Sequence, residues 1–169
     1  SGVLIFLAFP GWNLHPLAWF GLVPLLVATQ GATPRRGFWL GLLAGTVTNA
    51  GGFHWMTVML QEFGHLPAPV TWAILGLQAV TQGLAMAVGI GLWRWLVARG
   101  APSAPSAFLA LWAGEAAVPM IFPWFLGNAI SPELPMIQIA ELGGVALVSA
   151  LLYAANVALA ELVAGVWRG

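Results

Sequence analysis

The sequence has 169 residues, of which 60% are hydrophobic and 6% are charged, and its formal net charge at pH 7 is zero. A soluble domain has roughly 25% charged residues, so this composition excludes an ordinary soluble domain and predicts a membrane protein. The neutral charge gives no basis for a nucleic-acid partner, and the absence of cysteine excludes disulfides, thiolate metal sites and a cysteine nucleophile from these residues.

Long apolar stretches predict membrane helices, each of which needs about 20 residues. The first stretch ends at Pro10-Gly11 and has no basic start or cleavage site, so we interpret it as the end of a truncated helix and not as a signal peptide. The second contains Pro16 and Pro24, which predict a tilt or kink. Together the stretches predict an all-α fold, a polytopic membrane helix bundle of about six transmembrane helices in one domain, 1–169. The predicted spans are 2–9, 15–29, 37–60, 69–97, 106–121 and 136–166.

The arginines predict an orientation for this bundle. If the predicted helices cross the membrane in alternation, every arginine falls on the same side, and the positive-inside rule makes that side the cytoplasm. The opposite loops, rich in Trp, Phe, Pro and His, then face the periplasm, and there we expect a functional face. The arginines are Arg35, Arg36, Arg94, Arg99 and Arg168, and the outward loops are 10–14, 61–67 and 122–135.

Glu115 lies in the middle of the fifth predicted span, where an ionisable side chain is costly and is a candidate for function. Its carboxylate either contacts substrate, positions an outward loop, or ties two helices together by hydrogen bonds. Glu141, near the outer boundary of the sixth span, is a second candidate. Gln78 and Gln82 are four residues apart, so they share a helix face and are predicted to bond to neighbouring helices.

The histidines do not predict a metal site. His15, His54 and His65 lie near the outward side, but their spacing is not that of metal ligands and Glu62 is the nearest carboxylate. We therefore expect no metal and no cofactor. The small residues at positions 41 and 45 predict close helix packing within the chain. No nucleotide-binding loop, nucleophile elbow or zinc-protease motif is present in the sequence.

Several short motifs occur in an order that resembles the membrane part of bacterial apolipoprotein N-acyltransferases. Each motif is short, and the resemblance rests on their order and spacing along nearly the whole chain. They are residues 7–19 (LAFPGWNLHPLAW), 35–38 (RRGF), 51–55 (GGFHW), 63–69 (FGHLPAP), 111–115 (LWAGE), 122–124 (FPW), 137–145 (IQIAELGGV) and 156–161 (NVALAE).

The resemblance implies an inner-membrane enzyme that moves an acyl chain from a phospholipid to the amino group of a lipoprotein's N-terminal cysteine. It also implies a periplasmic nitrilase-like domain that uses Glu, Lys and Cys and follows these residues, so no catalytic residue is assigned here. The implied partners are membrane phospholipid, the lipoprotein substrate, and a periplasmic catalytic domain or other subunits. The candidates for contact with lipid or substrate are Glu115, His54, Trp55, Phe122, Pro123, Trp124, Asn128 and Glu141.

Two other functions stay open at this point. A non-enzymatic membrane scaffold or partner subunit is favoured by Ala116-Ala117, which follows Glu115 where the family has Arg-Gly, and by the absence of lysine and cysteine. A small transporter would need a polar pathway or internal repeats, and only Glu115 is deep and ionisable. A nitrilase-like domain in the complete protein would distinguish the acyltransferase from the scaffold.

Overall fold

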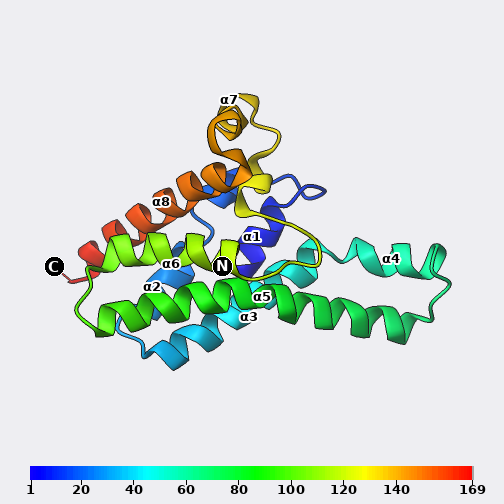
Figure 1. The fold of residues 1–169 in the computed structure, drawn as a ribbon, viewed down its shortest axis with the longest axis horizontal. Coiled ribbons are helices and arrows are strands. Elements are labelled where there is room, and N and C mark those ends of the chain that lie inside the picture. The colour runs from blue at the N-terminus through cyan, green and yellow to red at the C-terminus, as the bar shows by residue number, and fades with distance from the viewer. Residues whose placement is uncertain (169) are drawn as a thin grey trace.

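The computed structural model describes residues 1–168, and these residues form helices and connecting loops without any strand. Helix α5 (Ala68–Ala98) runs along the length of the molecule, and α3 (Pro34–Gly52) and α6 (Ser103–Ala117) pack against it (Figure 1). The other elements are α1 (Gly2–Ala8), the 3₁₀ helix η1 (His15–Trp19), α2 (Val23–Thr29), α4 (Trp55–Glu62), the 3₁₀ helix η2 (Leu126–Ile130), α7 (Leu134–Ile137) and α8 (Ala140–Arg168).

Glycines bring α3 and α5 into backbone contact. A Cβ atom added at Gly45 would lie 2.7 Å from the carbonyl oxygen of Gly83, and one added at Gly41 would lie 2.7 Å from the carbonyl oxygen of Met86. Larger side chains would therefore force the two helices apart. The close packing predicted from the small residues at 41 and 45 is confirmed.

The predicted span 37–60 is not one continuous helix, because the helix breaks at Phe53 and His54, between α3 and α4. At Gly52 the ring of Phe9 lies so close that an added Cβ would be 2.1 Å from it. Two successive glycines at the end of α3 stabilise a helix less than other residues would, and the missing side chain of Gly52 leaves room for the Phe9 ring. Helix α4 then packs on the first turns of α5 and extends away from the main body (Figure 1).

The predicted kink in residues 15–29 is confirmed, since this stretch forms η1 and α2 with a turn between them. Both helices have a proline in their first turn, a position that proline favours. The turn is held by Asn156 of α8. Its Oδ1 accepts a hydrogen bond from the backbone N–H of Leu22 at 2.8 Å, and its Nδ2 donates to the carbonyl oxygen of Ala18 at 2.8 Å.

The last two predicted spans also need correction. Helix α6 ends at Ala117, so residues 118–121 of the predicted span 106–121 are not helical; Val118 is extended, as residues before proline usually are. Within the predicted span 136–166, α7 is separate and α8 is broken at Gly143 and Gly144, the latter with φ of 67°, which favours glycine. The spans 69–97 and 2–9 agree with α5 and α1 within one residue.

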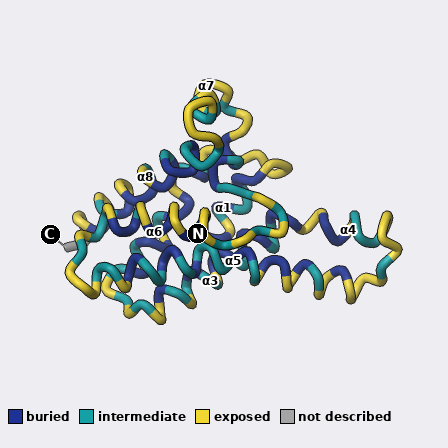
Figure 2. Tube along the Cα trace, in the orientation of Figure 1, coloured by how far each residue is buried: buried dark blue, intermediate teal, exposed yellow. Residues whose placement is uncertain are grey.

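Two helices are long and apolar enough to cross a membrane by length and composition, namely α5 and the part of α8 over Ala140–Val166. The other helices of residues 1–168 are shorter, so the prediction of about six transmembrane helices is not confirmed. Exposed residues lie along the outer faces of α5 and α8 and make up most of α7, whereas α4 has both buried and exposed residues (Figure 2). Large apolar side chains are exposed on α3, α5, α6 and α8, including Trp39, Leu43, Leu77, Leu109 and Leu162.

Candidate functional site

Glu115 lies on the face of α6 that packs against α8, and its residue is only 6% exposed. Its carboxylate accepts a hydrogen bond from Ser149 Oγ at 2.7 Å and another from the hydroxyl of Tyr153, both on α8. The predicted tie between two helices is therefore present. A buried carboxylate is stable in such a place only because these donors replace the water that it has lost.

The same network holds the segment that follows α6, residues 118–133, which we call the outer loop. Ser149 Oγ accepts a hydrogen bond from the backbone N–H of Gly127 at 2.9 Å. On the opposite side, Gln82 Oε1 accepts a hydrogen bond from the backbone N–H of Phe122 at 3.0 Å. The outer loop is thus tethered at two backbone positions by polar side chains that are buried inside the bundle.

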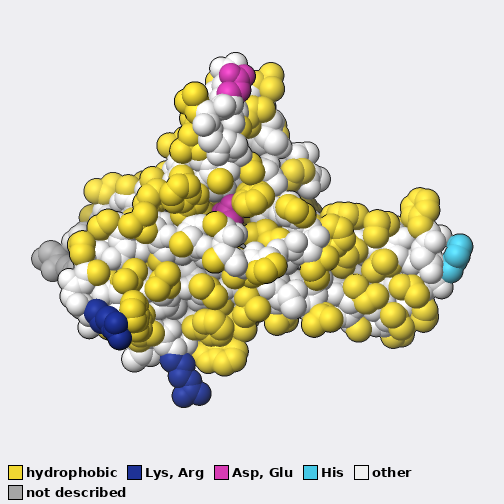
Figure 3. All heavy atoms as spheres, in the orientation of Figure 1, with side chains coloured by type: hydrophobic (Ala, Val, Ile, Leu, Met, Phe, Trp, Pro, Cys, Tyr) yellow, Lys and Arg dark blue, Asp and Glu magenta, His cyan; other side chains and the backbone are white. Residues whose placement is uncertain are grey.

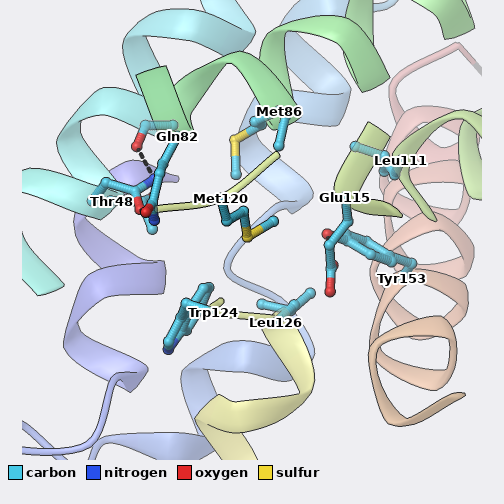
Figure 4. Close-up of a pocket in the computed structure, with 12 residues that line it drawn as sticks. Thr48, Gln82, Met86, Leu111, Glu115, Met120, Trp124, Leu126 and Tyr153 are labelled. Carbon is cyan, nitrogen blue, oxygen red and sulfur yellow. Dashed lines mark hydrogen bonds between the residues drawn. The ribbon is translucent and has the colours of Figure 1, made fainter. Parts of the chain in front are cut away.

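A small inner cavity separates the two tethers. Figure 4 shows Glu115 and Tyr153 on one side of it, Gln82 on the other, and Met86 and Met120 between them. Its volume is about 50 Å³, which is room for one or two water molecules and not for an acyl chain. The geometry therefore supports a role for Glu115 in positioning the outer loop and not in contacting a large substrate.

The hydrogen bond of Gln82 to the outer loop can be tested by comparing Gln82 with Gln78. Both side chains are buried on α5, and the two residues are 4% and 2% exposed. Gln82 Nε2 also donates to Asn49 Oδ1 at 3.0 Å, so it joins α5, α3 and the outer loop, whereas the amide of Gln78 has no hydrogen-bond partner in residues 1–168. The prediction that both bond to neighbouring helices is right for Gln82 and wrong for Gln78.

We expect Gln82→Leu to lower the free energy of unfolding by about 1–3 kcal/mol. The substitution leaves the backbone N–H of Phe122 and the side-chain carbonyl of Asn49 without their hydrogen-bond partner. We expect Gln78→Leu to be neutral or stabilising, since it removes an amide that is buried without a partner. Thermal unfolding of both variants in detergent checks this. Equal destabilisation by the two substitutions would contradict the role of Gln82 as a tether.

An aromatic groove lies on the outside of the outer loop, and we call it the outer groove. The rings of Phe9 and Trp124 are stacked with centroids 3.6 Å apart, and Phe122 packs against Phe53 and Trp55 with centroid distances of 5.8 and 6.5 Å. The groove has a volume of about 380 Å³. It is lined by Phe9, Pro10, Gly52, Phe53, Trp55, Trp124, Asn128 and Ser131.

Comparison with known proteins identifies the fold family. The profile of the apolipoprotein N-acyltransferase N-terminal domain matches residues 1–158. An apolipoprotein N-acyltransferase of Geobacter metallireducens is 37% identical over 169 residues, which are 98% of this chain and 32% of that protein. One of Gloeobacter violaceus is 34% identical over 187 residues, covering 95% of this chain and 33% of that protein.

The chain belongs to the apolipoprotein N-acyltransferase family. Its match is to the N-terminal domain of that family, as the resemblance of the short motifs implied. The chain spans about a third of the length of the curated relatives that it matches.

The structure brings together some of the residues that the family resemblance predicted. Trp55, Trp124 and Asn128 line the outer groove, and Phe122 packs on its wall. Trp124 also lines the inner cavity, and its indole N–H has no hydrogen-bond partner in the described part of the chain. Pro123 is exposed between these two aromatic residues.

Two predicted residues of this family member lie apart from the groove. The Nδ1 atom of His54 is 2.8 Å from the carbonyl oxygen of Gly51, and its ring faces Trp12, with centroids 5.8 Å apart. Glu141 is exposed and forms no side-chain hydrogen bond or ion pair within residues 1–168. Neither is joined to the network of Glu115.

Sequence reasoning missed Ser149 and Tyr153, which hold Glu115, although a signal for them exists. Together with Asn156 they are spaced by four and three residues along an apolar helix, which places three polar side chains on one face. It also missed the contact of His15 Nε2 with Glu133 Oε1, at 3.2 Å, which joins η1 to the end of the outer loop. Within the described residues, no three histidine or acidic side chains gather as a metal site would require.

Proposed function

We propose that these residues form the membrane-embedded part of an apolipoprotein N-acyltransferase, which transfers an acyl chain from a phospholipid to the N-terminal cysteine of a lipoprotein. The family membership supports this activity, because the relatives have that name and this chain matches part of each. The role of the chain is to anchor a periplasmic catalytic domain and to admit lipid to it. As one domain over residues 1–169, it supplies no catalytic residue itself.

The outer groove is the observation on which this role rests. Its walls are aromatic, and it has room for part of an acyl chain beside Asn128, which offers a polar side chain for a lipid ester. We therefore assign lipid contact to Trp55, Phe122, Trp124 and Asn128. His54, Pro123 and Glu141 are proposed as contacts of the lipoprotein or of the catalytic domain.

The proposal includes a topology in the bacterial inner membrane with about six crossings. Basic side chains gather at the end where α5 finishes, and histidine lies at the opposite end of the molecule (Figure 3). By the positive-inside rule the arginine end is cytoplasmic, and the loops 10–14, 61–67 and 122–135 are periplasmic. Helix α5 has 31 residues, about 46 Å at 1.5 Å per residue, so it extends beyond a hydrocarbon core of about 30 Å.

The activity is tested by complementation. The full-length protein is expressed in bacteria depleted of their own apolipoprotein N-acyltransferase, and the N-terminal peptide of a lipoprotein is analysed by mass spectrometry. We expect the amide-linked third acyl chain to be restored, and the intact enzyme to have about three times the mass of these residues. A protein that is present in the membrane but leaves the lipoprotein diacylated would contradict the activity and favour the scaffold.

The outer groove is tested separately by filling it. Ser131 lines the groove and is exposed, so Ser131→Phe adds a ring there without disturbing the core. We expect kcat/KM to fall roughly tenfold or more, equivalent to about 1.4 kcal/mol of transition-state binding. The control Leu109→Phe places a ring at an exposed position of α6 far from the groove in sequence and is expected to leave the rate unchanged. Equal rates for the two variants would remove the groove from the lipid path.

A further inference from the structure

Arg94, near the end of α5, is buried without an acidic partner. The residue is 8% exposed, and it makes no ion pair with any carboxylate in the described residues. Its aliphatic stem packs on α3 at Gly37, where an added Cβ would be 2.9 Å from Arg94 Cγ. Its Nε donates to the carbonyl oxygen of Ala32 at 3.0 Å, which fixes the guanidinium beside the turn between α2 and α3.

The two Nη groups of Arg94 form no hydrogen bond with residues 1–168. Arg94 lines a pocket of about 500 Å³, together with Gln30, Gly31, Val97 and Ser103. The Nη atoms are not among the fully buried polar atoms that lack a partner, so they are accessible from the pocket and can bind an anion there. The pocket is therefore lined by a cation whose donors are free and whose position is fixed.

The start of α6 borders the same pocket through Ser103, the first residue of that helix. The Nε1 atom of Trp93 donates to the carbonyl oxygen of Ser103 at 3.1 Å and holds the helix start against α5. The first N–H groups of a helix have no partner within it, and the helix dipole is positive at that end. Two independent sources of positive potential thus meet at one pocket.

The carboxylate of Glu161 lies beside the start of α6 and offsets part of the positive potential of that helix, whereas Arg94 has no acidic partner in the described residues. Glu161 Oε1 accepts a hydrogen bond from Ser103 Oγ at 2.9 Å, and Glu161 is not among the residues that line the pocket. Further positive charge comes from Arg35 and Arg36, in the first turn of α3, and from Arg99, which follows the last residue of α5. Basic side chains gather at this end of the molecule (Figure 3).

From these observations we infer that the pocket binds the phosphate of an anionic phospholipid, taken from the leaflet at the arginine end. The planar guanidinium can offer both Nη groups to two phosphate oxygens, a geometry that arginine favours. Basic pockets between helices on the cytoplasmic side of membranes bind lipid headgroups in this manner.

The surface near the pocket is apolar and suits a lipid better than a free phosphate ion. A shallow, open apolar groove lies at the same end of α5, on a side of the helix turned away from Arg94 and Val97, and an acyl chain can lie along it. It is lined by Pro34, Phe38, Val88, Gly91, Leu92 and Trp95. The guanidinium of Arg99 stacks on Trp95, 3.8 Å from the ring centroid, so positive charge caps this groove as well.

This lipid site lies at the other end of the bundle from the outer groove and does not depend on the proposed acyl transfer. It is tested by native mass spectrometry of the full-length protein in detergent, mixed with phosphatidylglycerol, phosphatidylcholine or inorganic phosphate. We expect the wild-type protein to retain phosphatidylglycerol in preference to phosphatidylcholine. We expect Arg94→Gln to weaken that retention roughly tenfold, as the loss of one charge-assisted contact predicts.

Two further variants keep the experiment decisive. Arg36→Gln removes an exposed arginine that does not line the pocket, and we expect it to retain the lipid. Val97→Phe is designed to fill the pocket while Arg94 keeps its hydrogen bond to Ala32. This variant tests the site even if Arg94→Gln does not fold, and we expect it to lose phosphatidylglycerol.

The inference is wrong if Arg94→Gln and Val97→Phe both retain phosphatidylglycerol, or if Arg36→Gln loses as much lipid as they do. If inorganic phosphate binds with the same dependence on Arg94 while phosphatidylglycerol does not, the pocket takes a free anion and its assignment to a lipid is wrong.

Discussion

Glu115→Leu is expected to loosen the outer loop and to reduce acyl transfer by the full-length protein. The substitution leaves the buried hydroxyl groups of Tyr153 and Ser149 without their acceptor, at a cost of about 1–3 kcal/mol for each. Ser149 Oγ also accepts the hydrogen bond from the backbone N–H of Gly127. A Ser149 side chain that is no longer fixed by Glu115 therefore holds the outer loop less firmly. Hydrogen exchange measured by mass spectrometry should show roughly 10- to 100-fold lower protection over residues 118–133.

The matched variant is Glu115→Gln, which keeps the shape of the side chain and can accept from one hydroxyl while it donates to the other. We expect it to retain the protection of the outer loop and most of the activity. If Glu115→Gln is as inactive as Glu115→Leu while the loop stays protected, the negative charge itself acts on a substrate, and a positioning role for Glu115 is excluded.

Gly45→Ala is expected to destabilise the bundle, although it adds only one methyl group. The added Cβ would lie 2.7–2.8 Å from backbone atoms of Gly83, which cannot move aside as a flexible side chain could. Overpacking of this kind costs about 1–3 kcal/mol and shifts the helices apart. Because α3 and α5 share the most extensive contact in the fold, the loss should appear as a lower unfolding temperature and lower yield in the membrane.

The same substitution at Gly76 is the control. Gly76 is an exposed residue of α5, and an added Cβ there meets no atom within 4 Å. In a helix, alanine is more stable than glycine by up to about 1 kcal/mol, so Gly76→Ala should be neutral or stabilising. The unfolding temperatures of the Gly45→Ala and Gly76→Ala variants are measured in parallel. A similar decrease in both would mean that the close approach of α3 and α5 does not limit stability.

Hydropathy predicted the apolar stretches of the fold but not their continuity. The stretches end near the right places because proline and arginine mark the turns, as at Arg99 and Pro102. The breaks after Gly51-Gly52 and at Gly143-Gly144 were not predicted, since glycine is also common inside membrane helices. At the end of α3 the Phe9 ring packs on Gly52, a contact between residues far apart in sequence that hydropathy does not predict.

The candidate site was predicted in part for a similar reason. Glu115 was found because an ionisable side chain is conspicuous in an apolar stretch. Its partners Ser149 and Tyr153 are ordinary residues in a membrane helix, and only the contact of α6 with α8 gives them a role. Phe9 and Phe53 were missed as walls of the outer groove because phenylalanine in an apolar stretch indicates nothing beyond burial.

The hydrogen bonds of Asn156 have a consequence for the order of assembly during synthesis. They join α8 to the turn between η1 and α2 across 134 and 138 positions of the chain. The hydrogen-bond donors of Glu115 are also on α8, which is synthesised after all the other described helices. Until α8 packs against the earlier helices, these polar groups lack the partners that they have in the folded structure. The packing of α8 therefore fixes both the turn between η1 and α2 and the side chain of Glu115.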